Sequence, residues 1–199
     1  MNAAEAEFTD WKLPSPRKVA VACLILTESA LFTIFVVAYL FYMGKSLNGP
    51  YPQDVLEFPW VASAALLSSS LTIMLAEFFL HRGGRLGFHL WWAVTILLGA
   101  YFLWFTAMEW RHLIFEKNLT LATNVFGTTF YSLVGLHASH VIVGLFLLGL
   151  MLVLSLLGKV GKSHTEHIEM ISWYWHFVDL IWVVVLTVVY IISMKVPNV

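Results

Sequence analysis

The chain has 199 residues, of which 60% are hydrophobic and 12% are charged, and its mean hydropathy is +0.81. Soluble domains carry about twice that share of charged residues, so we predict an integral membrane protein. The formal net charge of -1 provides no basic field that could gather nucleic acid, which excludes a nucleic-acid partner. Because Cys23 is the single cysteine, neither a disulfide framework nor a multi-cysteine metal site can form.

Five apolar runs are each at or above the roughly 20 residues that a membrane-spanning helix needs. They cover residues 19–43, 58–80, 86–108, 125–157 and 168–194. Short segments with turn-forming residues separate the runs, and none is long enough for a second domain. We therefore predict an all-α membrane protein, with a short N-terminal tail over 1–18 and a five-transmembrane-helix bundle over 19–199.

The basic residues predict the orientation of the bundle. With the N-terminus inside, seven of them fall in cytoplasmic segments and four in outer segments. The cytoplasmic set comprises Lys12, Arg17, Lys18, Arg82, Arg85, Lys159 and Lys162. The outer set comprises Lys45, Arg111, Lys117 and Lys195. This bias favours a cytoplasmic N-terminus and a periplasmic C-terminus.

Two acidic residues lie deep inside apolar runs. Glu28 comes ten residues after Lys18, hence roughly 15 Å into a hydrocarbon layer about 30 Å thick. Asp179 comes twelve residues after His167, so both acids are expected at one level, near the midplane. A carboxyl at this depth persists only where it faces protein or water. We expect Glu28 to be protonated and hydrogen-bonded at rest, either as a structural bond to a neighbouring helix or as a group that handles protons.

His137 and His140 are three residues apart and share a helical face, a spacing that a metal ion could use. Two ligands are too few for a zinc or haem site, and His176 is expected at another depth. We therefore expect hydrogen bonds to other helices instead. The expected depths place both histidines in the outer half, where Glu109 is a candidate partner, so two polar layers are predicted.

The last run holds the densest polar pattern. His176 and Asp179 share a helical face, and Trp175, Asp179 and Trp182 form one stripe. The chain contains no hydrolase, phosphate-loop or dinucleotide motif. It therefore shows no complete catalytic site, and we expect the bundle to work with a partner.

Three segments of the chain closely resemble the subunit III family of haem-copper terminal oxidases, in order and in spacing. They are FGTTF at 126–130, GLHASHVIVG at 135–144 and WYWHFVDLIW at 173–182. The environments of Glu28 and Glu109 also resemble the acidic motifs of that family. Where the family usually has Gly-Leu between the two histidines, this chain has Ala138-Ser139.

The resemblance implies the five-helix bacterial form, an accessory subunit of a cytochrome c oxidase complex in the inner membrane. Such a subunit has no catalytic residues and binds no haem or copper, which belong to partner subunits. It packs beside subunit I, near subunit II, holds phospholipid in its clefts and supports proton uptake. The Glu28 position would be the family's buried carboxyl. The interhelical or lipid-contact motif would comprise Glu109, His137, His140, Trp175, His176 and Asp179.

Alternatives stay open at the level of sequence. The WYWHFVD pattern favours cytochrome c, rather than a quinol, as the electron donor of the complex. A related five-helix protein accompanies some nitric oxide reductases and has similar motifs. An independent proton-coupled transporter built on Glu28 and Asp179 is an alternative of another class, although the chain shows no internal repeat of the kind such transporters have.

Overall fold

The computed structural model describes residues 15–159 and 165–196, and these contain no β-strand. Five helices in the described residues are long and apolar enough to cross a membrane, as predicted. They are α2 (Pro16–Tyr42), α4 (Trp60–His81), α5 (Arg85–Phe115), α6 (Val125–Leu156) and α7 (Thr165–Leu186). A short helix, α3 (Pro52–Val55), precedes α4, and α7 continues through π-helical η3 (Thr187–Ile192) and 3-10 helix η4 (Ser193–Lys195). Most of the predicted tail, residues 1–14, lies outside the described residues.

α2 and α5 extend further than predicted, and α7 begins at Thr165 rather than at 168. α2 begins at Pro16 because Ser15 caps it, accepting a hydrogen bond from the backbone N–H of Lys18, and proline suits a first helical turn. α5 continues to Phe115 rather than ending near 108, so Glu109 lies within a helix. Hydropathy marks where the apolar run ends, but a helix can continue into the interface with polar residues.

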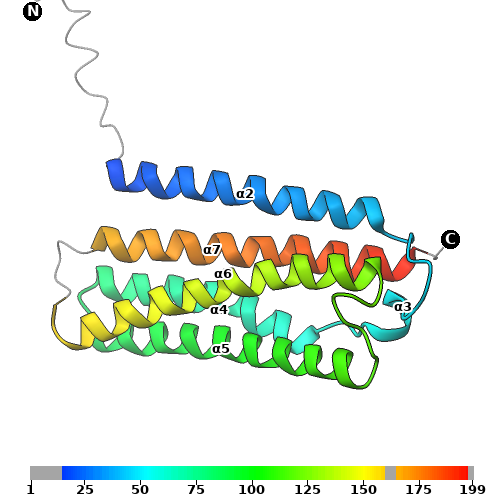
Figure 1. Ribbon diagram of the computed structural model, residues 1–199. Helices are drawn as coiled ribbons and strands as arrows, with labels where there is room; N and C mark the ends of the chain where they lie inside the picture. Colours follow the sequence, from blue (N-terminus) through cyan, green and yellow to red (C-terminus); the bar gives the residue numbers. More distant parts are fainter. Residues whose placement is uncertain (1–14, 160–164, 197–199) are drawn as a thin grey trace, which may run out of the picture.

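The helices lie side by side along a common direction, and α7 has the central place (Figure 1). α4 and α5 form the most extensive helix pair, α6 packs against α5 and α2, and α7 contacts α2, α4 and α6. Half of the apolar window of α7 is buried, against 6% for α2. α2 is therefore the outermost helix, with most of its surface open to the membrane or to a partner.

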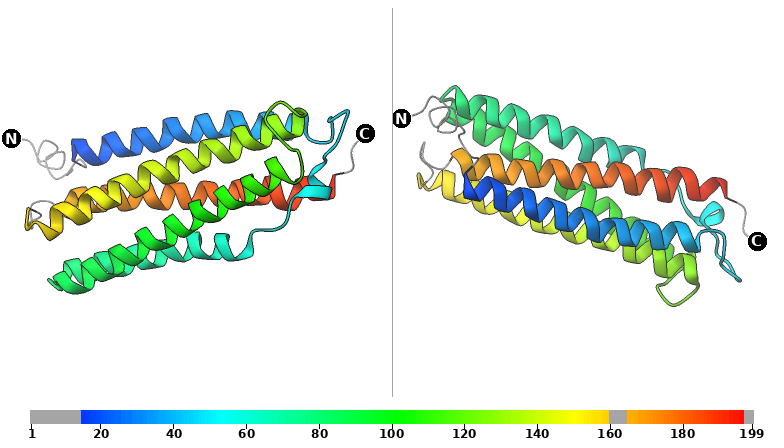
Figure 2. Two further views of the ribbon diagram at one scale, coloured as in Figure 1. Left: turned by 60° about the horizontal axis from the view of Figure 1, so that its bottom comes forward. Right: turned by 90° about the horizontal axis from the view of Figure 1, so that it is seen from above.

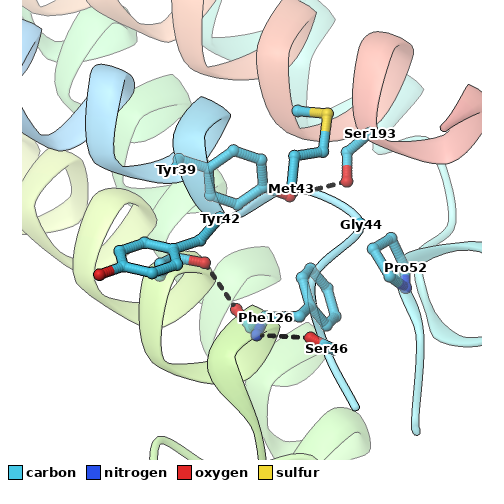
Figure 3. A pocket seen from close by; sticks show the side chains of 9 residues that line it. Tyr39, Tyr42, Met43, Gly44, Ser46, Pro52, Phe126 and Ser193 are labelled. Atoms are coloured by element: carbon cyan, nitrogen blue, oxygen red, sulfur yellow. Dashed lines mark hydrogen bonds between the residues drawn. The ribbon is translucent and has the colours of Figure 1, made fainter. Parts of the chain in front are cut away.

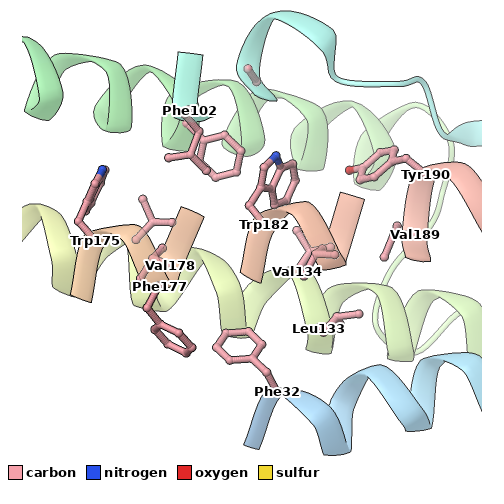
Figure 4. Packing of buried hydrophobic residues seen from close by; sticks show 14 of the residues in the cluster. Phe32, Phe102, Leu133, Val134, Trp175, Phe177, Val178, Trp182, Val189 and Tyr190 are labelled. Atoms are coloured by element: carbon pink, nitrogen blue, oxygen red, sulfur yellow. The ribbon is translucent and has the colours of Figure 1, made fainter. Parts of the chain in front are cut away.

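At the core, Trp175 lies between two glycines of neighbouring helices. A Cβ at Gly99 of α5 or at Gly144 of α6 would come within 2.7 Å or 2.8 Å of the indole ring, closer than atoms can pack. Trp175 is fully buried, and Trp182 and Phe102 extend the same core (Figure 4). The two glycines thus leave room on α5 and α6 for the indole ring of α7.

The connections at one end of the bundle, which we call the α3 end, pack against the helix ends (Figure 2). The hydroxyl of Tyr39 on α2 donates to Ser193 Oγ at 2.9 Å, and the backbone N–H of Phe126 donates to Ser46 Oγ at 3.1 Å (Figure 3). Asn124, the N-cap of α6, donates to the carbonyls of Asn48 and Pro50. These bonds hold the first loop against α6 and the end of α7.

Gly144→Ala should destabilise the protein by about 1–3 kcal/mol, because the added methyl group overlaps the enclosed Trp175 ring. The free energy of unfolding in mixed detergent micelles, followed by helical circular dichroism, measures this effect. Gly149→Ala on the same helix is the control, since a Cβ there meets no atom within 4 Å. Equal stability of the two variants would contradict the described packing.

Candidate functional site

A row of serines on α4 faces the buried stripe of α7. The indole N–H of Trp175 donates to Ser69 Oγ at 2.8 Å, and the indole N–H of Trp182 donates to Ser63 Oγ at 3.1 Å. Ser69 and Ser63 are buried, at 0% and 4% exposure. Each buried indole therefore has a partner from the neighbouring helix, which fixes the rotation of α7 against α4.

Asp179 joins the same row between the two tryptophans. Its side chain is buried, and Oδ2 accepts hydrogen bonds from Ser70 and, at 3.5 Å, from Ser69. Ser70 Oγ also lies 3.0 Å from Nδ1 of His176. The His176–Asp179 motif of α7 thus contacts two serines of α4. These serines were not predicted, although the run Ser68-Ser69-Ser70 within an apolar helix is a signal that could have identified them.

Glu28 pairs with His140 across the contact of α2 and α6. Glu28 Oε2 lies 3.1 Å from Nε2 of His140, and the side chains are 26% and 14% exposed. Nδ1 of His140 is 2.8 Å from the carbonyl oxygen of Leu136. A carbonyl only accepts, so Nδ1 carries a hydrogen. The Nε2–Oε2 contact then holds one proton, either on Glu28 or on a charged imidazole.

A pocket of about 210 Å³ opens beside this pair. Glu28 and His140 line it together with Leu24, Ser139, Val143 and Tyr174. The Tyr174 hydroxyl donates to the carbonyl oxygen of His140 at 3.3 Å. A second, apolar pocket of about 310 Å³ shares Leu24, Val143 and Tyr174 with the first and extends towards His167. The shared proton therefore lies beside space that a small polar or apolar molecule could occupy.

The expected contact between the histidines and Glu109 is wrong. His140 bonds to Glu28, and Glu109 instead accepts hydrogen bonds from the Tyr190 hydroxyl at 3.0 Å and 3.1 Å. His140 is fifteen residues into α6, about 22 Å from the start of a helix that is longer than the membrane, so it lies near mid-height rather than in an outer layer.

His137 faces a different environment from His140. It is fully buried, stacks on Trp182 with ring centroids 5.0 Å apart, and meets Phe102 edge-on. Neither of its ring nitrogens has a hydrogen-bond partner among the described residues. One turn of α6 thus places one histidine in the aromatic core and the other at a carboxyl.

Ion pairs join α2 and α7 at the end opposite to the α3 end. Lys18 Nζ is 2.9 Å from Glu169, Arg17 is 3.5 Å from Glu166, and Ser15 also donates to Glu166. Within 15–159 and 165–196, no three His, Cys, Asp or Glu side chains come together as metal ligands.

Comparison with known proteins identifies the family of this chain. Residues 18–194 match the family described as Cytochrome c oxidase subunit III. The chain belongs to this family. It is 32% identical to cytochrome c oxidase subunit 3 of Alkalihalophilus pseudofirmus over 83% of this chain and 82% of that protein. It is also 34% identical to cytochrome c oxidase subunit 3 of Synechocystis, over 90% and 77% of the two chains. It is 34% identical to cytochrome bo(3) ubiquinol oxidase subunit 3 of Pseudomonas aeruginosa, over 85% and 81%.

At the level of the family, this chain is therefore a subunit III of the haem-copper oxidases. It is a multi-pass membrane protein. The three segments with family motifs contain His140 and the α7 stripe. The polar contacts described above join α2 to α6 and α7 to α4.

Ser69→Ala should destabilise the subunit III bundle by about 1 kcal/mol, because the buried indole N–H of Trp175 loses its acceptor. Ser68→Ala is the matched control, since among the residues that the structure describes Ser68 Oγ bonds only to the carbonyl of Ala65 on its own helix. Unfolding in mixed micelles compares the two variants. A loss of stability in both, or in neither, would contradict a specific Ser69–Trp175 bond.

Proposed function

We propose that this chain is the non-catalytic subunit III of a proton-translocating haem-copper oxygen reductase in the bacterial inner membrane. It packs against subunit I, which with the other subunits carries haem and copper, and supports proton uptake there. Cytochrome c is the electron donor of the complex, and phospholipid occupies clefts of the chain. Family membership supports the assignment to the complex, and the Glu28–His140 pair supports the role in proton uptake.

The Glu28–His140 contact is the observation on which proton uptake depends. With Nδ1 directed at the Leu136 carbonyl, the pair can keep its proton on the carboxyl or transfer it to Nε2 without moving either side chain. Both states are close in geometry, and the adjoining pocket gives access to the pair. A group that changes protonation state at constant geometry is suited to accept and release protons during turnover.

The choice of cytochrome c as donor is supported by relatives and by one motif. The relatives from Alkalihalophilus pseudofirmus and Synechocystis carry the name cytochrome c oxidase subunit 3. The WYWHFVD pattern of α7 resembles that branch, whereas the Pseudomonas aeruginosa relative is named as part of a ubiquinol oxidase. The reduction of a purified complex by cytochrome c or by a quinol distinguishes the two donors.

Mild solubilisation of native membranes should co-purify this chain with a haem-containing large subunit that consumes oxygen. Affinity capture of the tagged chain, followed by absorption spectra and oxygen-electrode measurements, tests this. Isolation of the chain alone and colourless would contradict the proposal. Proton-coupled transport by the purified chain in liposomes, abolished by Glu28→Gln, would support an independent transporter instead.

Glu28→Ala should leave the haem spectrum of the complex unchanged and slow proton uptake, with a several-fold fall in turnovers before inactivation. Among the described residues, the Glu28 carboxyl is the only acid in contact with His140, so its loss removes the shared proton. Glu28→Gln keeps a polar side chain but cannot release a proton, and should behave in the same way. Thr27→Val is the control, because within the described part of the chain Thr27 bonds only to the carbonyl of Leu24 on its own helix.

Oxygen consumption and proton uptake by the reconstituted complex measure the effect. Loss of haem in Glu28→Ala would contradict a supporting role. Full activity and a normal lifetime in Glu28→Gln would contradict proton exchange at this position.

A further inference from the structure

The hydrogen bonds of Ser70 determine which nitrogen of His176 carries the hydrogen. Ser70 has one hydroxyl hydrogen, which it donates to Oδ2 of Asp179. Ser70 Oγ can then only accept from Nδ1 of His176, which lies 3.0 Å away. In a neutral ring Nε2 is therefore a hydrogen-bond acceptor.

Nε2 of His176 makes no hydrogen bond to any described residue. The His176 ring is half-buried, and its Nε2 is not enclosed but lies at the surface of the bundle. This contrasts with His140, whose two nitrogens both have partners within the chain. His176 thus presents an unused acceptor to whatever covers α7.

This acceptor lies near the middle of the membrane. His176 is eleven residues past Thr165, the start of α7, or about 16 Å along the helix in a hydrocarbon layer about 30 Å thick. Lipid headgroups and bulk water lie at the two interfaces, and acyl chains cannot donate a hydrogen bond. A donor for Nε2 at this height therefore has to come from another protein segment.

The side chains around Nε2 form a large apolar surface. On the same face of α7, Trp173, Leu180 and Val183 are 42%, 63% and 41% exposed. Trp173 lies beside Lys18 of α2 and His176 beside Ser70 of α4, and α7 is open to view between these two helices in the right-hand view of Figure 2. A single acceptor surrounded by exposed apolar side chains is the pattern by which one transmembrane helix recognises another.

We propose that the α7 docking face, comprising Trp173, His176, Leu180 and Val183, binds a membrane-spanning helix of another subunit. That helix presents an N–H or O–H donor to Nε2 of His176. The proposal rests on the proposed function, since it requires a complex, and it adds which face of the chain is covered and which chemistry its partner carries.

His176→Phe tests the docking face in the complete complex. Phenylalanine keeps a ring of similar size but removes the acceptor, so the share of the chain retained with the haem-containing subunit after detergent purification should fall about fivefold. His176→Gln is the matched control, because its amide oxygen can accept the same bond, and it should restore most of the retention. Unfolding of each isolated variant shows that the loss is not one of folding.

A photo-crosslinking amino acid in place of Leu180 identifies the occupant directly. We expect adducts to a haem-containing subunit, identified by mass spectrometry. Adducts to lipid alone, or to a second copy of this chain, would overturn the docking face even where the wild-type chain co-purifies with the oxidase. Equal retention of His176→Phe and wild type would overturn it as well. Failure of wild-type co-purification would instead contradict the proposed function.

Discussion

A hydrocarbon layer supplies no hydrogen bonds, and this constraint explains most polar contacts of the bundle. The indole of Trp175, the carboxyl of Asp179 and the ring of His176 are all directed at serines of α4. Each serine is small enough to let the helices approach and polar enough to satisfy a partner. α4 and α7 are therefore joined by a row of polar pairs, while large apolar side chains fill the rest of the core.

The arrangement of helices follows from where small and large residues meet. Gly99 and Gly144 leave room for Trp175, so α5, α6 and α7 pack around one indole ring. α2 has no comparable contact, and only 6% of its apolar window is buried. The same chain thus contains a tightly packed centre and a peripheral helix, which is held by the buried side chains of Phe32 and Tyr39 and by a few polar pairs.

The sequence predicted the five spans because bilayer thickness sets the length of an apolar run, but it did not predict which polar residues meet. His140 was expected near Glu109, yet it contacts Glu28, because α6 is longer than the membrane is thick and its first residue does not mark the membrane surface. Tyr190, the partner of Glu109, lies in the π-helical part of the last span, where a period of 3.6 residues no longer assigns faces. Helix rotation depends on all neighbours at once, so the partners of Glu28 and Asp179 required the structure.

α2 is held to the rest of the bundle at three heights, and the chemistry differs at each. Lys18 pairs with Glu169 at one end, and Tyr39 bonds to Ser193 at the other. The middle contact, Glu28 with His140, is different because its one proton can lie on either partner. Transfer of that proton changes the pair from neutral to charged in a region of low dielectric constant, where the two states differ most in their interaction with water and neighbouring dipoles. The least buried helix therefore meets the core through a pair that shares one proton.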